Sequence, residues 1–244
     1  MSPRIGILVV AYNAESTLAS VLDRIPAEIA AKTTEVIVLD DASADRTHDV
    51  GQEYRRPELD GKLVVRKNPV NLMYGGNQKL GYRIAMEHAL DIVVLLHGDG
   101  QYAPEVMQDL IGPLERGEAE LVMGSRMLVP GAARRGGMPL YKYIGNRILT
   151  TYQNLVAGTR LSEFHSGYRA YSVAALREVD LDALTDSWHF DTQIILELRR
   201  LGKRIVEVPI PTYYGDEICY VEGIPYAWNC VRTTTTHAWR MRRR

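Results

Sequence analysis

The sequence predicts an α/β fold in which a mostly parallel, Rossmann-like central sheet is flanked by helices. Short apolar runs alternate with amphipathic stretches through the first half of the chain. The runs lack the polar–apolar alternation of a strand with one wet face, so we expect them to be buried on both faces. Polar residues directly follow several runs, at the strand ends where doubly wound sheets bind ligands.

Five strands are expected in the first half, each from an apolar run, at residues 5–11, 35–39, 62–66, 92–96 and 120–123. Between them, apolar side chains recur at helical spacing around residues 18–25, 76–90 and 106–114, and a helix is also expected within 44–54. After residue 125 the pattern changes. A Gly- and Arg-rich stretch at 130–139 predicts a mobile loop, followed by a helix at 141–156 and a short strand at 168–171. A helix at 190–201 then precedes a strand at 205–211, whose prolines indicate a sheet edge.

Composition excludes several classes of protein. The chain has 244 residues, a formal charge of −1 from 29 basic and 30 acidic side chains, and 46% hydrophobic residues. This balance argues against a basic nucleic-acid binder and against a disordered chain. Two cysteines, Cys219 and Cys230, cannot build a disulfide framework or a four-cysteine metal site. The N-terminal apolar run is too short for a signal peptide and no run reaches about 18 residues, so a cytoplasmic protein without a membrane span is expected.

Four polar clusters fall at the ends of four predicted strands. They are residues 11–15 (AYNAE), 40–47 (DDASADRT), 97–101 (HGDGQ) and 124–126 (GSR). In a parallel sheet these ends converge on one edge, which predicts a ligand site there. Asp99 and Gln101 supply oxygen donors of the kind that divalent cations prefer. Asp40 and Asp41 fit hydrogen bonds to a nucleobase or ribose, or else a solvated strand end or helix cap.

The same residues resemble the family-2 glycosyltransferases. The strand ending Ala11-Tyr12-Asn13, with Glu15 after it, and residues 40–47 resemble that family's entry and its Asp-Asp-Gly/Ser-Ser-x-Asp-x-Thr motif. Residues 71–81 (NLMYGGNQKLG) are similar to its Asn-x-Gly-x-Gly-x-Ala stretch, and residues 96–105 (LHGDGQYAPE) to its metal motif, often Asp-x-Asp-x-Gln-x-x-Pro-Glu. Residues 124–126 and 166–171 (SGYRAY) resemble blocks of the dolichyl- or polyprenyl-phosphate sugar transferase branch. The resemblance spans about residues 5–215.

The resemblance implies a GT-A fold and a nucleotide-sugar transferase. It implies one domain at 1–215, with a nucleotide-binding half to about 125 and an acceptor half from about 126, and a helical tail at 216–244 with a basic end. The implied nucleotide contacts are Ala11, Tyr12, Asn13, Glu15, Asp40, Asp41, Ser43, Lys79, Gly98 and Asp99. The implied metal ligands are Asp99 and Gln101, with His97 as a weak one, and the implied catalytic residues are Asp99, Arg126 and Arg169. Asp191 is added to the catalytic residues as a candidate base. The expected contacts to the acceptor or its phosphate are Arg134, Arg135, Lys142 and Arg169.

His97 departs from the family pattern, because it occupies the position of the first acid of the metal motif. Imidazole ligates Mn²⁺ but suits Mg²⁺ poorly. His97 is therefore a weak ligand, a donor to a diphosphate, or a strand-end residue only. Asp99 remains the principal expected ligand of a Mg²⁺ or Mn²⁺ cofactor.

The expected reaction moves a sugar from a UDP- or GDP-sugar to an acceptor with inversion. A cation on Asp99, with Arg126 nearby, would stabilise the charge of the leaving diphosphate. A polyprenyl- or dolichyl-phosphate acceptor is already an anion and needs no base. A sugar or glycan hydroxyl requires one, for which Asp191 is the candidate, although a helix N-terminal acid is the commoner role.

Two basic segments are also candidates for function. Arg134 and Arg135, with Lys142 beyond them, fit a mobile lid that bound phosphates would order, or a solvated loop. Replacing both arginines by Ala is expected to raise the apparent KM for donor or acceptor if the lid exists. The tail at 224–244 is either a basic amphipathic segment on a membrane surface or a packed terminal helix.

Other function classes fit less well. A nucleotidyltransferase would carry a glycine-rich loop after the first strand, and residues 11–15 contain no glycine. A dinucleotide oxidoreductase would show Gly-x-Gly-x-x-Gly there. A non-catalytic nucleotide-sugar sensor stays open because of His97. Acids concentrate at the strand ends of the first half and arginines in the 130–139 stretch and the last five residues, a distribution that favours phosphorylated substrates.

Overall fold

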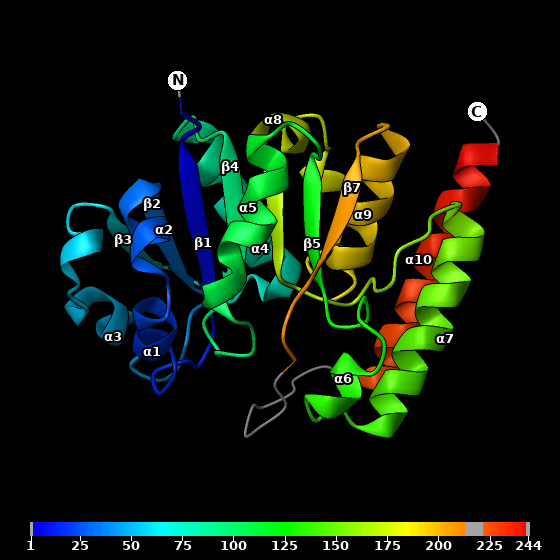
Figure 1. The fold of residues 1–244 in the computed structure, drawn as a ribbon, viewed down its shortest axis with the longest axis horizontal. Helices are drawn as coiled ribbons and strands as arrows, with labels where there is room; N and C mark the ends of the chain where they lie inside the picture. The colour runs from blue at the N-terminus through cyan, green and yellow to red at the C-terminus, as the bar shows by residue number, and fades with distance from the viewer. Residues whose placement is uncertain (1, 213–221, 243–244) are drawn as a thin grey trace.

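A computed structural model of the 244-residue chain describes residues 2–212 and 222–242. Its central sheet has the strand order β3-β2-β1-β4-β6-β5-β7 (Figure 1). The strands are β1 (Ile5–Ala11), β2 (Thr33–Asp40), β3 (Leu63–Lys67), β4 (Ile92–His97), β5 (Leu121–Ser125), β6 (Arg169–Ser172) and β7 (Ile205–Pro209). Every neighbouring pair is parallel except β4–β6 and β6–β5, because β6 enters the sheet in the opposite direction. The expected mostly parallel α/β fold is confirmed, and β7 lies at an edge as its prolines predicted.

Helices connect and cover the strands. They are α1 (Leu18–Asp23), α2 (Ala27–Lys32), α3 (Thr47–Glu53), α4 (Met73–Glu87), α5 (Met107–Glu115), α6 (Ala132–Arg135), α7 (Leu140–Ala157), α8 (Val173–Leu176), α9 (Phe190–Arg200) and α10 (Gly223–Arg242). Short 3-10 turns occur at Pro57–Leu59, Pro104–Val106 and Leu181–Ala183. Among residues 2–212 and 222–242, no helix is both long and apolar enough to cross a bilayer.

The core consists of two apolar layers, one on each face of the sheet. Along β1, Ile7 and Val9 pack into the layer under α1, α2 and α5, whereas Leu8 packs into the layer under α4, α8 and α9. All three side chains are fully buried, as expected for strands covered on both faces. Helix α4 lies especially close, because a Cβ on its Gly81 would come 2.2 Å from the Leu8 side chain. This packing holds the carboxyl ends of β1, β2 and β4 in register at one edge.

Two expectations about the second half need correction or completion. The stretch at 130–139, expected to be a mobile loop, contains the short helix α6, whose Gly136 and Met138 amides bond back to Ala132 and Ala133. The tail forms α10, which packs against α7 and α9 and buries Cys230 and Thr234 (Figure 1). Cys219 and the expected domain boundary at residue 215 lie outside the described residues.

Candidate active site

The loops after β1 and β2 interlock through hydrogen bonds, which fixes most of the expected nucleotide-binding residues as one unit. The Asn13 amide donates to Ser43 Oγ at 2.9 Å, and Asn13 Oδ1 accepts from the Ala44 amide at 3.0 Å. Glu15 Oε2 accepts from the Arg46 amide at 2.8 Å. Asn13 itself has a left-handed φ of 49°, a conformation that asparagine tolerates better than most residues. The two polar clusters predicted from the sequence are therefore adjacent.

Asp40 and Asp41 have different surroundings, although both are buried. Asp40 Oδ1 accepts from the Ser43 amide at 2.9 Å, so this residue closes the turn after β2. Asp41 Oδ1 accepts from Asn68 Nδ2 and from the Leu72 amide, both at 2.8 Å. Asp41 thus joins the end of β2 to the segments that follow β3. Both interpretations of this pair, turn cap and nucleotide contact, are compatible with the arrangement.

Lys79 points toward the loop before α9. Its Nζ lies 2.6 Å from Asp186 Oδ1 and donates to the Leu184 carbonyl at 2.9 Å. The amides of Gly75 and Gly76, at the start of α4, donate to the Asp186 carbonyl. In this arrangement Lys79 ties α4 to the 184–186 segment, and its expected contact with a nucleotide stays a prediction.

A cavity of about 960 Å³ lies at the end of β4. Polar side chains from β4, the loop after β5 and the start of α9 form one wall. An apolar wall comes from α7 and α10. The residues that line this cavity include His97, Asp99, Gln101, Arg126, Lys142, Asp191, Tyr74, Trp188, Met138, Tyr141, Leu149, Ala227, Trp228 and Val231. The structure therefore brings together the expected metal ligands, Arg126 and Asp191.

His97 is held between two tyrosine rings. Tyr74 and Tyr102 pack edge-on against it, with ring centroids at 5.6 and 5.0 Å. Burial lowers the pKa of His97 although Asp99 and Asp191 act to raise it, so the imidazole is neutral near pH 7. Gly167 closes the third side, where a Cβ would come 2.6 Å from His97 Cε1 and 2.8 Å from Tyr74 Oη. Only a glycine fits this approach without displacing the ring.

Asp191 and Arg169 form an ion pair under the cavity. Arg169 is fully buried, and its Nη1 lies 3.2 Å from Asp191 Oδ1. Its other donors go to the carbonyls of Ser166 and Phe164. Tyr74 Oη donates to Asp191 Oδ2 at 2.9 Å. Arg169 has no exposed surface and reaches the cavity through Asp191, and its expected contact with an acceptor phosphate stays a prediction. Asp191 is both in the first turn of α9 and on the cavity wall.

Arg126 is fixed by a second buried ion pair, with Glu163. Nη2 and Nε of Arg126 both bond to Glu163 Oε1, and the Arg126 amide donates to Oε2 at 2.9 Å. Asn146 of α7 adds a bond to Glu163 Oε1 at 2.8 Å. Burial raises the pKa of Glu163, but the Arg126 charge and these hydrogen bonds outweigh it, so the net pKa lies below its usual range. Arg126 therefore presents a fixed positive charge to the cavity.

The basic residues of the expected lid separate into two groups. Lys142, in the first turn of α7, lines the cavity. Arg134 and Arg135 are exposed on α6, where Arg134 Nη1 bonds to the Met138 carbonyl and Arg135 Nη1 bonds to the Pro130 carbonyl at 3.5 Å. Neither arginine lines the cavity, and the lid they were expected to form stays a prediction.

The donor set for a divalent cation is sparse but chemically suitable. Within the described ranges, no three His, Cys, Asp or Glu side chains cluster as a preformed metal site. Asp99 is exposed and lines the cavity, and its Oδ1 accepts from the Gln101 amide at 3.0 Å, whereas its Oδ2 makes no hydrogen bond with the described residues. Mg²⁺ typically takes one or two carboxylates and completes its shell with substrate phosphates and water. Asp99 with a donor diphosphate fits that pattern, and neutral His97 lies at the same strand end.

Several site residues carry no recognisable sequence signal. Tyr74 stacks on Trp188 with ring centroids 4.7 Å apart, and together they shape the cavity around Asp191. Glu163 lies only three residues before the 166–171 block, yet nothing in its neighbourhood marks it as the partner of Arg126. Asn68 is also unmarked, although it bonds both Asp41 and Asn77.

Comparison with known proteins agrees with this geometry. The model of "Glycosyl transferase family 2" matches residues 6–180. The chain belongs to this family. An undecaprenyl-phosphate mannosyltransferase of Micrococcus luteus is 32% identical over 85% of this chain and 82% of its own length. A UDP-N-acetylglucosamine–dolichyl-phosphate N-acetylglucosaminyltransferase of Methanococcus voltae is 27% identical over 87% of this chain and 86% of its own. The family-2 chain is therefore a glycosyltransferase, and the predicted enzyme class is confirmed.

Solved structures confirm the GT-A fold. Glucosyl-3-phosphoglycerate synthase of Mycobacterium tuberculosis in complex with phosphoglyceric acid aligns with a TM-score of 0.72 at 22% identity, covering 97% of this chain and 80% of that one. The same enzyme in complex with Mn²⁺, UDP and phosphoglyceric acid aligns with a TM-score of 0.69 at 20% identity, covering 97% and 78%.

Proposed function

We propose that this glycosyltransferase moves a sugar from a nucleotide-diphospho-sugar to the phosphate of a polyprenyl lipid, with inversion. The observation that carries the proposal is the composition of the 960 Å³ cavity. It combines the charged side chains of Asp99, Arg126 and Lys142 with apolar side chains from α7 and α10. Such a cavity suits an acceptor with an anionic head and an apolar chain. Relatives named for undecaprenyl- and dolichyl-phosphate acceptors support it.

The donor would lie along the interlocked loops after β1 and β2, with its diphosphate toward Asp99. Breaking the bond between the anomeric carbon and the diphosphate oxygen builds negative charge on the leaving group. Arg126 is held in place by Glu163 before the reaction begins, so its charge stabilises that developing charge without reorganisation. Asp99 and Gln101 would hold a divalent cation, which when bound supplies further stabilisation of the diphosphate.

The acceptor phosphate would attack the anomeric carbon from the opposite side, which inverts that centre. Because a phosphate oxygen is already negative near neutral pH, no side chain has to remove a proton. Lys142, on the cavity wall, would orient this phosphate as a donor of charge-assisted hydrogen bonds. Arg169 is a positioning residue in this scheme, since it pairs with Asp191 and has no exposed surface.

A hydroxyl acceptor on a sugar or glycan is the second candidate, and Asp191 is the observation that favours it. Asp191 lines the cavity, and its Oδ1 makes no hydrogen bond with any described residue, so it is placed to take a proton from a hydroxyl. Arg169 Nη1 lies 3.2 Å from the same oxygen, so Asp191 is already the counter-charge of a buried guanidinium. This engagement favours the phosphate acceptor.

Peripheral contact with the cytoplasmic membrane face would bring the lipid to the cavity. Helix α7 exposes Leu140, Tyr141, Ile144 and Ile148 on one side, and α10 exposes Trp228 and Trp239. Apolar stripes with interfacial aromatics are typical of helices that lie in a membrane surface. Flotation with liposomes tests this directly: Ile144→Ser/Ile148→Ser should float less than wild type, and equal flotation would contradict the contact.

The proposed function is tested with purified protein, labelled UDP- and GDP-sugars, Mn²⁺ or Mg²⁺, and undecaprenyl phosphate in detergent. We expect label to enter the lipid phase for one donor, and the Asp99→Asn variant to lose transfer. Glu118→Gln, a substitution on the exposed surface of the loop before β5, serves as the control. No lipid-linked sugar with any donor, together with label on a soluble glycan, would contradict the phosphate acceptor.

A further inference from the structure

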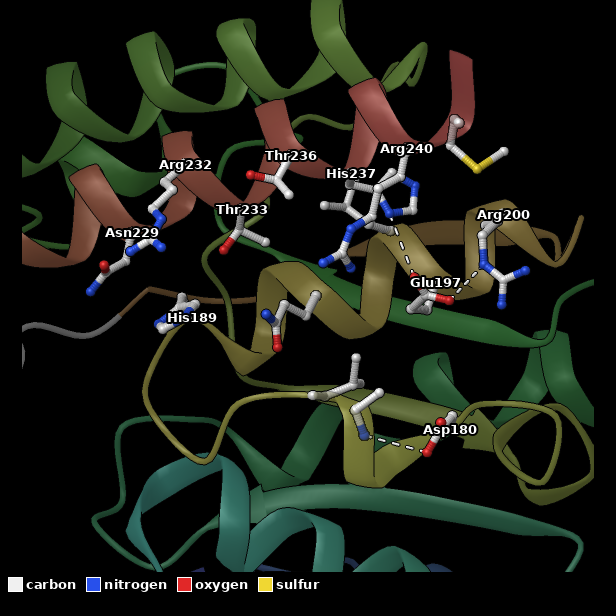
Figure 2. A pocket seen from close by; sticks show the side chains of 15 residues that line it. Asp180, His189, Glu197, Arg200, Asn229, Arg232, Thr233, Thr236, His237 and Arg240 are labelled. Carbon is white, nitrogen blue, oxygen red and sulfur yellow. Dashed lines mark hydrogen bonds and ion pairs between the residues drawn. The ribbon is translucent and has the colours of Figure 1, made fainter. Parts of the chain in front are cut away.

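A second groove, of about 540 Å³, lies between α9 and α10, behind the helix face that lines the active-site cavity. Figure 2 shows Arg232, Thr233, Thr236, His237 and Arg240 projecting from α10 toward α9. His189, Glu197 and Arg200 face them from the other wall, and Asp180 lies at one end. Helix α10 thus separates two pockets, each lined by its own set of side chains.

The carboxylates in this groove are engaged. Glu197 is 2.6 Å from Arg200 Nε and 3.6 Å from His237 Nδ1, and these contacts lower the pKa of Glu197, with the His237 hydrogen bond as the largest cause. Asp180 accepts from the Ala183 amide at 3.3 Å as the cap of a 3-10 turn. Neither carboxylate approaches an α10 arginine within ion-pair distance.

Arg232 and Arg240 supply positive charge without a carboxylate partner in the described part of the chain. The side chains beside them add donors: Thr233, Thr236 and Asn229 make no side-chain hydrogen bond among the described residues. His189 Nδ1 is also buried, and it makes no hydrogen bond with residues 2–212 or 222–242. Burial and the Arg232 charge lower the pKa of His189, so this ring is neutral near pH 7 and can donate one hydrogen bond.

We propose that the α9–α10 groove binds a phosphate group, as a second anion site distinct from the active-site cavity. Two guanidinium groups, two hydroxyls and an amide line this one groove, and these are the kinds of donor that a tetrahedral oxyanion accepts hydrogen bonds from. Guanidinium groups also bind phosphate bidentately, which a single lysine cannot do. The site takes either a phosphate in solution or the phosphate of a lipid headgroup.

The helix periodicity favours the lipid headgroup. Arg232 follows Trp228 by one helical turn and precedes Trp239 by two, so these three side chains form one strip along α10, at the border between the groove and the cavity that Trp228 lines. Both tryptophans are more than half exposed. Tryptophan rings prefer the headgroup level of a bilayer, which would place the mouth of the groove at the depth of the lipid phosphates.

The test compares wild type with the double variant Arg232→Gln/Arg240→Gln. Arg4→Gln/Arg66→Gln is the matched control, because it removes the same charge from exposed positions near the start of β1 and on β3. Inorganic phosphate binding is measured by calorimetry at constant ionic strength, and vesicle binding by sedimentation with phosphatidylcholine alone or with added phosphatidylglycerol. No donor or acceptor is present, so the result does not depend on the proposed reaction. Phosphate bound at the active site contributes equally to all three proteins.

We expect the double variant to bind phosphate or anionic vesicles at least tenfold more weakly than wild type and control, with an unchanged Tm. Loss confined to inorganic phosphate identifies a soluble phosphate as the ligand, and loss of anionic-vesicle binding identifies the lipid headgroup. If wild type, control and double variant bind both probes equally, the groove is not an anion site and the proposal is overturned. If the double variant does not fold, the single variant Arg232→Gln is measured in its place.

Discussion

The buried pair of Arg126 and Glu163 should contribute strongly to the stability of the second half of the chain. Glu163 is fully buried and Arg126 is 7% exposed, and the Glu163 carboxylate accepts bonds from the Arg126 side chain, the Arg126 amide and Asn146. Glu163→Gln leaves the guanidinium buried without its counter-charge. Breaking such a pair from one side costs about 3–5 kcal/mol. For a chain of this size that lowers the Tm by about 6–20 °C.

Differential scanning calorimetry measures this shift, and Glu118→Gln is the matched control. Glu118 makes two bonds of 2.8 Å with Arg116, but both side chains are more than half exposed. Water screens such a pair, so the control should melt close to wild type. The double variant Arg126→Met/Glu163→Leu removes both charges and should melt above Glu163→Gln. The reasoning is refuted if Glu163→Gln melts with the control, or if the double variant is the least stable of the set.

The stability that the same pair contributes should decrease at acid pH. The folded-state pKa of Glu163 lies below its ordinary value of 4.5, mainly because the Arg126 charge overcomes the effect of burial. The unfolded chain therefore binds the proton more readily, and the contribution to stability is present above pH 4.5 and lost as pH falls through the folded-state pKa. The Tm difference between wild type and Glu163→Gln should be full at pH 7 and shrink below pH 4.5.

Three further outcomes are expected. His165, whose Nδ1 bonds to Tyr226 Oη, has its pKa lowered to about 4 by burial, so wild type should lose stability as pH falls from 6.5 to 4. His165→Gln should flatten this slope in thermal melts, and an equal slope in both proteins would contradict the buried neutral ring. Gly167→Ala places a Cβ 2.6 Å from His97, so we expect a lower kcat and a free energy of unfolding lower by about 1–3 kcal/mol. Wild-type kinetics in this variant would contradict the tight approach. UDP with Mn²⁺ should raise the Tm of wild type and not of Asp99→Asn, and an equal rise in both would remove Asp99 as a metal ligand.

The sheet could be predicted from the sequence because most of its strands are continuous runs of apolar residues. Residues 5–11 and 92–96 are apolar almost throughout, and in the structure these side chains are buried on both faces of the sheet. The polar residues after them then had to meet at one edge. What no local pattern reveals is that β6 runs antiparallel between β4 and β5, since strand direction depends on the long connection through α7.

The site was predictable where function is carried by polar residues at strand ends, and not where it depends on packing. Asp99 and Arg126 follow strands directly and could be named from the sequence. Glu163 and Tyr74 depend on contacts between distant segments, which a single sequence does not disclose. For Arg169 the sequence shows the motif but not the environment of the side chain. Only the structure shows that it is fully buried against Asp191.

The central claim is that the acceptor is a lipid phosphate that needs no base. The most direct measurement compares undecaprenyl phosphate with undecaprenol, the same lipid without the phosphate, as acceptors for one labelled nucleotide sugar. We expect transfer to undecaprenyl phosphate alone, with Asp191→Asn keeping much of that transfer. Equal transfer to undecaprenol, or complete loss of transfer in Asp191→Asn with an unchanged Tm, would contradict it.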